Sequence, residues 1–201
     1  MKIESLMVPN PITITIQSNV QQAIELMKIN SIRHLPVIDS QKHLIGFLTL
    51  ADLKQALIPS MLGDLTLADM MIKNPHTVSP DDDIEKAAQL IYKYKISGLP
   101  VTRNSLLVGI ITESDILHAF IDMMGLLSSS ARIDVTTGDN PGDLNRAIQI
   151  IYDQGGDIIN VAMTAQETSN RTYYFRLTPC NTDPIQKALE GAGFVVQAVM
   201  Q

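Results

Sequence analysis

The sequence GFLTLAD at residues 46–52 returns in altered form as GIITESD at residues 109–115, and this pair decides the fold. In each copy a glycine-led apolar run predicts a strand that ends on a threonine, and an aspartate follows three residues later. This spacing is typical of a capping box, in which the threonine caps a helix and the aspartate accepts a hydrogen bond from the threonine backbone. Each copy therefore predicts a strand that passes directly into a helix. The residues are Thr49 and Asp52 in the first copy and Thr112 and Asp115 in the second.

The duplication extends outward from these two motifs. Residues 7–39 align with residues 71–103 at a shift of 64, and residues 44–52 align with residues 107–115 at a shift of 63. Two units of nearly 60 residues are too small to bury much core alone. We therefore expect them to pack against each other about a pseudo-twofold axis, with a cleft between them.

Each unit has the pattern β-α-β-β-α. Alternation over residues 12–16 predicts a short strand, and the apolar residues that follow recur with helical spacing. Two apolar runs, 35–38 and 44–48, are separated by turn residues, and a second helix is expected to begin near Ala51 or Asp52. In the second unit Asn104-Ser105 marks the hairpin turn. The helix-face residues are Val20, Ala23, Ile24 and Met27 in the first unit and Ile84, Ala87, Ala88 and Ile91 in the second.

A further domain is expected after the duplicated part. Gly125 and the run Ser128-Ser129-Ser130 indicate a linker. From about Arg132 the order is β-α-β-β-α-β, with Pro184 opening the last helix. The predicted strands are 133–136, 158–163, 172–177 and 194–200. The expected fold class is α+β, divided into residues 1–62, 63–125, a linker at 126–131, and 132–201.

Composition excludes several classes of protein. The 201 residues carry 15 Lys and Arg against 21 Asp and Glu, a net charge of −6, which argues against phosphate-driven nucleic-acid binding. No apolar run reaches the roughly 18 residues of a membrane span, so we expect a cytoplasmic protein. The single cysteine, Cys180, argues against an internal disulfide. The histidines do not have the spacing of metal ligands, which argues against a metal site. No nucleophile motif is present, and we expect no catalysis.

The threonine–aspartate pairs have a second interpretation beside capping. A helix start at the cleft offers N–H groups to a phosphate, and the aspartate accepts hydrogen bonds from ribose hydroxyls. Both roles are compatible.

Together with Met-x-x-x-Pro-x-Thr at Met7 and Met71 and Leu-Pro-Val at Leu35 and Leu99, the doubled pattern resembles a tandem pair of CBS domains, the Bateman module. Similar modules bind AMP, ATP, S-adenosylmethionine, NAD or cyclic di-AMP. The resemblance implies ribose contacts at the aspartates and phosphate or ribose contacts at the threonines of the two motifs. The implied adenine-pocket residues are Thr13, the segment Ile32, Arg33, His34, Leu35 and Pro36, Thr77, and the segment Ile96, Ser97, Gly98, Leu99 and Pro100.

The two copies differ before Leu-Pro, where the first has Arg33-His34 and the second Ser97-Gly98. Arg33 is suited to pair with an anionic ligand and His34 to make that pairing pH-sensitive, or both are ordinary loop side chains. On the first interpretation, the pocket near Arg33 favours the more highly phosphorylated ligand.

Residues 132–201 resemble an ACT domain, a regulatory module that commonly pairs edge to edge and often binds amino acids. The resemblance rests on the first strand, the run 139–144 and the run Gly156 to Val161. A carboxylate is expected at the helix start and an amino group at Asn160, or the domain only dimerises. The candidate residues are Asp139, Asn140, Gly142, Asp143, Leu144 and Asn160.

A CBS pair followed by an ACT domain is similar to the acetoin-utilisation AcuB family. We expect a non-catalytic sensor that forms a homodimer and requires no cofactor. An adenine nucleotide is expected to change the relative angle of the two CBS units, and this change is expected to be passed on to the ACT domain or to a partner. Alternatives are a structural adaptor without bound nucleotide, a cyclic di-AMP or NAD receptor, and an NAD-dependent enzyme for which His34 is a weak catalytic candidate.

Overall fold

The structure, a computed structural model, describes residues 1–56, 66–138, 140, 142–163 and 171–200. The chain divides into two compact units, Met1–His118 and Ala119–Gln201, which are described separately. Across the described residues, no helix is long and apolar enough to cross a membrane.

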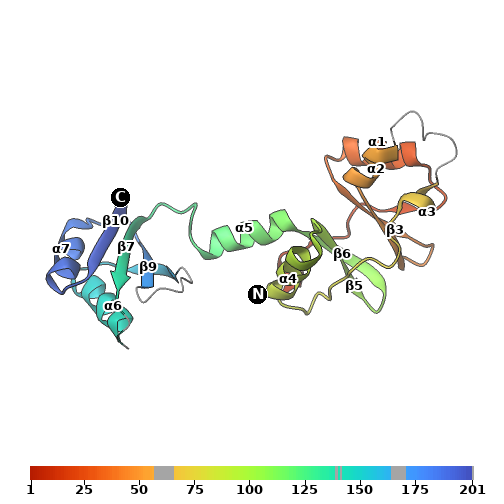
Figure 1. The fold of residues 1–201 in the computed structure, drawn as a ribbon. Coiled ribbons are helices and arrows are strands. Elements are labelled where there is room, and N and C mark those ends of the chain that lie inside the picture. Colours follow the sequence, from red (N-terminus) through yellow and green to blue (C-terminus); the bar gives the residue numbers. More distant parts are fainter. Residues whose placement is uncertain (57–65, 139, 141, 164–170, 201) are drawn as a thin grey trace. The chain divides into compact units, whose positions relative to one another are not determined.

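The first unit contains the duplicated part of the sequence (Figure 1). Its first copy comprises η1 (Ile3–Ser5), β1 (Val8–Pro9), β2 (Ile14–Thr15), α1 (Val20–Ile29), β3 (His34–Ile38), β4 (Leu44–Thr49) and α2 (Leu50–Ala56). The second copy comprises α3 (Leu67–Met70), α4 (Ile84–Tyr94), β5 (Gly98–Arg103), β6 (Leu106–Thr112) and the start of α5 (Glu113–Met123). The two predicted helix faces and the paired strands of each copy are confirmed.

The backbone repeats as the sequence does. Ser31 and Lys95, equivalent at a shift of 64, both adopt left-handed backbone angles, with φ of 54° and 55°. The hairpins β3–β4 and β5–β6 carry register shifts at equivalent places, after Val37 and after Val101. The duplication therefore reaches the details of the main chain.

The first predicted strand is shorter than expected. Of residues 12–16 only Ile14 and Thr15 pair with β3, and Ser18 N–H then donates to Thr15 O to form a turn. In the second copy the equivalent strand is reduced to a single bridge, between Val78 and Val101. Ile14 is buried and pairs with Val37, but the turn after Thr15 ends the pairing of β2 with β3.

Each copy contributes its entry segment to the other copy's sheet. Strand β1 pairs with β6 to give the order β1-β6-β5, while β2-β3-β4 form the other sheet. In the mirrored exchange, Phe47 and Ile72 form an isolated bridge. The exchanged segments pack closely, because a Cβ on Gly46 or on Gly109 would collide with Met71 or Met7. The packing of the two copies against each other is thus reinforced by one exchanged strand and one exchanged bridge.

The second unit has the predicted β-α-β-β-α-β order. It contains β7 (Ala131–Thr137), α6 (Asp143–Asp153), β8 (Ile158–Met163), β9 (Arg171–Leu177), α7 (Asp183–Gly191) and β10 (Val195–Met200). The antiparallel sheet has the order β10-β7-β9-β8, the ferredoxin-like arrangement. Figure 1 shows α6 and α7 on one side of this sheet, where Ala147, Ile151 and Leu189 join the buried core.

Candidate functional site

Both threonine–aspartate pairs form the expected helix caps. In the first copy, Asp52 Oδ2 accepts hydrogen bonds from the Thr49 N–H (3.1 Å) and the Thr49 hydroxyl (2.6 Å). In the second, Asp115 Oδ2 accepts from the Thr112 N–H (2.8 Å) and hydroxyl (2.7 Å). Each cap uses Oδ2 of its carboxylate and leaves Oδ1 outside these bonds. Capping and a second role at Oδ1 are therefore compatible in both copies.

The two half-buried carboxylates line two cavities of similar size, each with walls from both copies. The Asp52 cavity, of about 280 Å³, joins the first copy's cap to the loop before β5. The Asp115 cavity, of about 330 Å³, joins the second copy's cap to the loop before β3. The Asp52 cavity is lined by Phe47, Thr49, Ala51, Asp52, Ile72, Pro75, His76, Lys95, Ile96, Ser97 and Gly98. The Asp115 cavity is lined by Val8, Asn10, Pro11, Ile12, Ser31, Ile32, Arg33, His34, Ile110, Thr112 and Asp115.

The loops that carry Arg33 and Ser97 are held against the caps of their own copies by equivalent bonds. Leu50 N–H donates to Arg33 O at 2.8 Å, and Glu113 N–H donates to Ser97 O at 3.1 Å. Each loop is thus fixed to its own copy while it also lines the cavity of the other copy's aspartate. This crossing of walls was not predicted from the sequence.

His34 occupies the contact between the two copies. It is 7% exposed, its Nε2 shares a 2.7 Å hydrogen bond with Ser97 Oγ, and its ring stacks on Phe47 with centroids 5.7 Å apart. The residue equivalent to His34 is Gly98, whose Cβ, if it had one, would lie 3.1 Å from the His34 ring. Because these equivalent positions meet each other, a large side chain on one side requires a small one opposite.

Burial lowers the pKa of His34 from its ordinary value of 6.5, and the Arg33 guanidinium lowers it further. The carboxylates of Glu113 and Asp115 oppose the shift without cancelling it. The imidazole is therefore held in its neutral form around pH 7.

Several residues named from the sequence lie elsewhere. Leu35 and Leu99 are fully buried, and Pro36 and Pro100 are buried beside them in β3 and β5. Thr13 and Thr77 are half-buried, and among the described residues they are not part of either cavity lining.

Two residues that line the Asp52 cavity, His76 and Lys95, were not among those predicted from the sequence. His76 stacks on Tyr94 with centroids 3.9 Å apart, and the Lys95 ammonium lies 4.1 Å from the Tyr92 ring centroid. Comparing the two copies position by position singles these residues out, because the first copy has Ile12 and Ser31 in their places.

In the second unit a cavity of about 350 Å³ lies at the start of α6. Its lining includes Asn140, Gly142, Asp143 and Leu144, together with Arg171, which was not anticipated. Asp139, also predicted here, lies outside the described residues.

Asn160 belongs to a different part of the sheet. Its side-chain amide donates to Met123 O at 3.0 Å, and it lines a separate cavity of about 220 Å³. Within this chain the structure therefore does not bring Asn160 to the start of α6. No group of three or more potential metal ligands occurs in the part of the chain that the structure describes.

Comparisons with known proteins agree with the doubled architecture. The CBS domain profile matches residues 3–59 and 67–122. A putative acetoin utilization protein (AcuB) from Vibrio cholerae is 33% identical, with a TM-score of 0.56 over 63% of this chain and 95% of that chain.

Two similar solved structures contain adenosine compounds. The CBS domain pair of protein MJ0100, in complex with 5′-methylthioadenosine and S-adenosyl-L-methionine, is 29% identical, with a TM-score of 0.56 over 60% of this chain and 95% of that chain. CBSX2 in complex with AMP is 28% identical, with a TM-score of 0.54 over 61% of this chain and 97% of that chain.

Among curated relatives, an inosine-5′-monophosphate dehydrogenase from Korarchaeum cryptofilum is 31% identical over 147 residues, 73% of this chain and 30% of that enzyme. The chain thus spans less than a third of that relative's length. The residues matched by the CBS domain profile cover more than half of the chain and coincide with the two structural copies. The chain therefore belongs to the CBS domain family and contains a tandem CBS pair, the Bateman module.

Proposed function

We propose that this chain is a non-catalytic regulatory protein whose CBS pair binds an adenosine-containing ligand of the AMP, ADP or ATP class. The observation that carries the proposal is the pair of half-buried aspartates, each capping a helix through Oδ2 while lining a cavity. An Oδ1 that is not engaged in the cap suits the adjacent hydroxyls of a ribose. The similar structures with AMP and with S-adenosylmethionine support this ligand class.

Ligand binding would depend on how the two copies are arranged relative to each other. Each cavity takes its carboxylate from one copy and its loop from the other. A ligand that contacts both walls stabilises the arrangement in which these walls lie at the right separation. The buried contact between His34 and Gly98 lies where such an adjustment must occur.

We assign the second unit to the ACT class and propose that it relays the signal as a homodimer or to a protein partner. The support is its ferredoxin-like strand order and its cavity at the start of α6. Asn140, Gly142, Asp143 and Leu144 are the proposed amino-acid site, with Asp139 from the sequence. Asn160, held by Met123 O in this chain, would serve only a site formed with a second copy.

The proposal also includes an AcuB-like role, a cytoplasmic location and the lack of a required cofactor.

Thermal-shift assays with AMP, ADP, ATP, NAD, S-adenosylmethionine and cyclic di-AMP test the proposed ligand binding, because a ligand that binds only the folded state raises the melting temperature. A shift that disappears when Asp52 and Asp115 are both changed to Asn supports the proposal. No shift with any of these compounds favours the structural adaptor.

A further inference from the structure

The two cavities carry their positive charge at different positions. The loop of the Asp115 cavity reads Ser31-Ile32-Arg33-His34, and the equivalent loop of the Asp52 cavity reads Lys95-Ile96-Ser97-Gly98. The serine and the basic residue have exchanged places, two residues apart. The two cavities therefore offer a cation to different parts of a bound ligand.

The surroundings of the two cations differ in charge. Arg33 shares its cavity with the carboxylate of Asp115, and Glu113 lies close enough to influence the charge of His34. In the first copy Leu50 occupies the position equivalent to Glu113. The Asp115 cavity therefore has the carboxylates of Asp115 and Glu113 in its surroundings, whereas the Asp52 cavity has Asp52 and an uncharged residue at the position of Glu113. Lys95 lines the Asp52 cavity with its ammonium 4.1 Å from the Tyr92 ring centroid. Since like charges repel, a polyanion is disfavoured more at the Asp115 cavity.

The outer wall of the Asp52 cavity is also built differently. Lys95 follows the last turn of α4, and His76 lines the same cavity with its ring stacked on Tyr94. At the equivalent positions the Asp115 cavity has Ile12 and Ser31, neither of which carries a charge. The Asp52 cavity therefore has a basic residue and an imidazole at two positions where the Asp115 cavity has neither, while the Asp115 cavity carries its own at Arg33 and His34.

We infer that the Asp52 cavity selects the adenosine ligand with the longer phosphate chain, with Lys95 as the specificity-determining residue, and that the Asp115 cavity selects a less highly charged adenosine compound. This inference rests on the proposed function. It is opposite to the sequence-based expectation for the pocket near Arg33, which was argued from Arg33 and His34 without the charge of Glu113.

The test compares AMP and ATP by isothermal titration calorimetry at equal ionic strength, since salt screens the contacts in question. The Asp115→Asn variant isolates the Asp52 cavity and is expected to bind ATP more tightly than AMP. The Asp52→Asn variant isolates the Asp115 cavity and is expected to show no preference for ATP. The opposite pattern of preferences overturns the inference.

Lys95→Ser then tests the specificity residue in the Asp115→Asn background. Serine already occupies the equivalent position 31 with the same left-handed backbone, so the substitution suits the main chain. We expect about a tenfold loss of ATP affinity, as for one charge-assisted contact, and less than a twofold change for AMP. Lys95→Arg should restore the preference for ATP.

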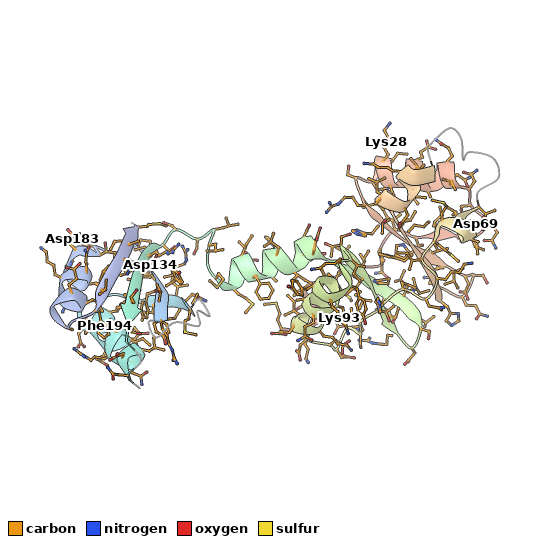
Figure 2. All side chains as sticks on the ribbon, viewed as in Figure 1. Lys28, Asp69, Lys93, Asp134, Asp183 and Phe194 are labelled. Atoms are coloured by element: carbon orange, nitrogen blue, oxygen red, sulfur yellow. The ribbon has the colours of Figure 1, made fainter. Side chains whose placement is uncertain are left out.

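Lys93→Ser is the matched control, because Lys93 lies in the last turn of α4 (Figure 2), two residues before Lys95, and is not part of the cavity lining. Its removal changes the net charge equally. Equal losses from Lys95→Ser and Lys93→Ser, or equal losses of AMP and ATP affinity, contradict the role of Lys95. Binding of both nucleotides with no effect of Lys95→Ser refutes the inference alone. No binding of any adenosine ligand by the unaltered protein refutes the proposed function with it.

Discussion

Gly98→Ala tests the contact between the two CBS copies. A Cβ at position 98 would lie 3.1 Å from both Cδ2 and Nε2 of His34, closer than ordinary van der Waals contact. The His34 ring has little room to retreat, since it is 7% exposed, stacks on Phe47 and is bonded to Ser97. Overpacking of this kind costs about 1–3 kcal/mol. Replacing glycine also lowers the entropy of the unfolded chain, which offsets about 0.4–1 kcal/mol, so the middles of the two ranges leave a net destabilisation of about 1.3 kcal/mol.

The measurement is urea unfolding of the whole chain with pulsed hydrogen–deuterium exchange, read on peptides from β3–β6. This readout separates unfolding of the first unit from that of the second. In a His34→Ala background the clash is absent, so Gly98→Ala should be neutral or slightly stabilising there. A coupling energy of about 1 kcal/mol or more between the two positions is expected. A Gly98→Ala protein as stable as the original, or additive effects in the double variant, would refute the reasoning.

Three further predictions concern stability. Burial holds the pKa of His34 below its ordinary value of 6.5, so as the pH falls this histidine is protonated in the unfolded chain before it is protonated in the folded one. The first unit should therefore lose stability below pH 6.5. The loss should be smaller in His34→Gln when urea midpoints are compared between pH 7.5 and 5.5. Gly109→Ala should destabilise by about 1–3 kcal/mol, and by more than Gly46→Ala. The three atoms nearest to a Cβ at 46 all belong to the flexible Met71 side chain, whereas those nearest to a Cβ at 109 include the backbone oxygen of Val8, at 3.2 Å. Equal urea midpoints would contradict this. Arg132→Met should cost the second unit about 3 kcal/mol, because Asp134, whose side chain is 9% exposed, loses its ion-pair partner at 2.6 Å; exchange on β7 peptides measures it, and Asp134→Leu in the same chain should recover most of the loss.

The repeated and periodic parts of the fold could be predicted from the sequence. Helical spacing of apolar residues located α1 and α4, and the second unit's six elements followed from alternating strands, turn residues and Pro184. The threonine–aspartate spacing predicted both caps. These features depend on contacts within a few residues, which local patterns encode.

The features that were missed depend on contacts between distant residues. Strand β1 has two residues and too little sequence to show alternation, and its partner Ile110 lies in the other copy. The contact between His34 and Gly98 was missed for the same reason, because the two residues lie far apart in the sequence. Lys95 differs from its equivalent Ser31 in the sequence, but its place in the same cavity lining as Asp52 is visible only in the structure. The strand expected at 12–16 is confirmed only at Ile14 and Thr15, because alternation does not show where a turn ends the pairing of two strands.

The most direct test of the account is binding of the adenosine panel to the unaltered protein and to the Asp52→Asn, Asp115→Asn double variant. Asparagine keeps one oxygen to accept the threonine bonds of each cap, but it loses the charge and the second acceptor. The account predicts that the unaltered chain binds at least one adenosine compound in calorimetry. It predicts at least a tenfold loss in the double variant, with a nearly unchanged melting temperature. Equal binding by both proteins, or no binding by the unaltered chain, would contradict it.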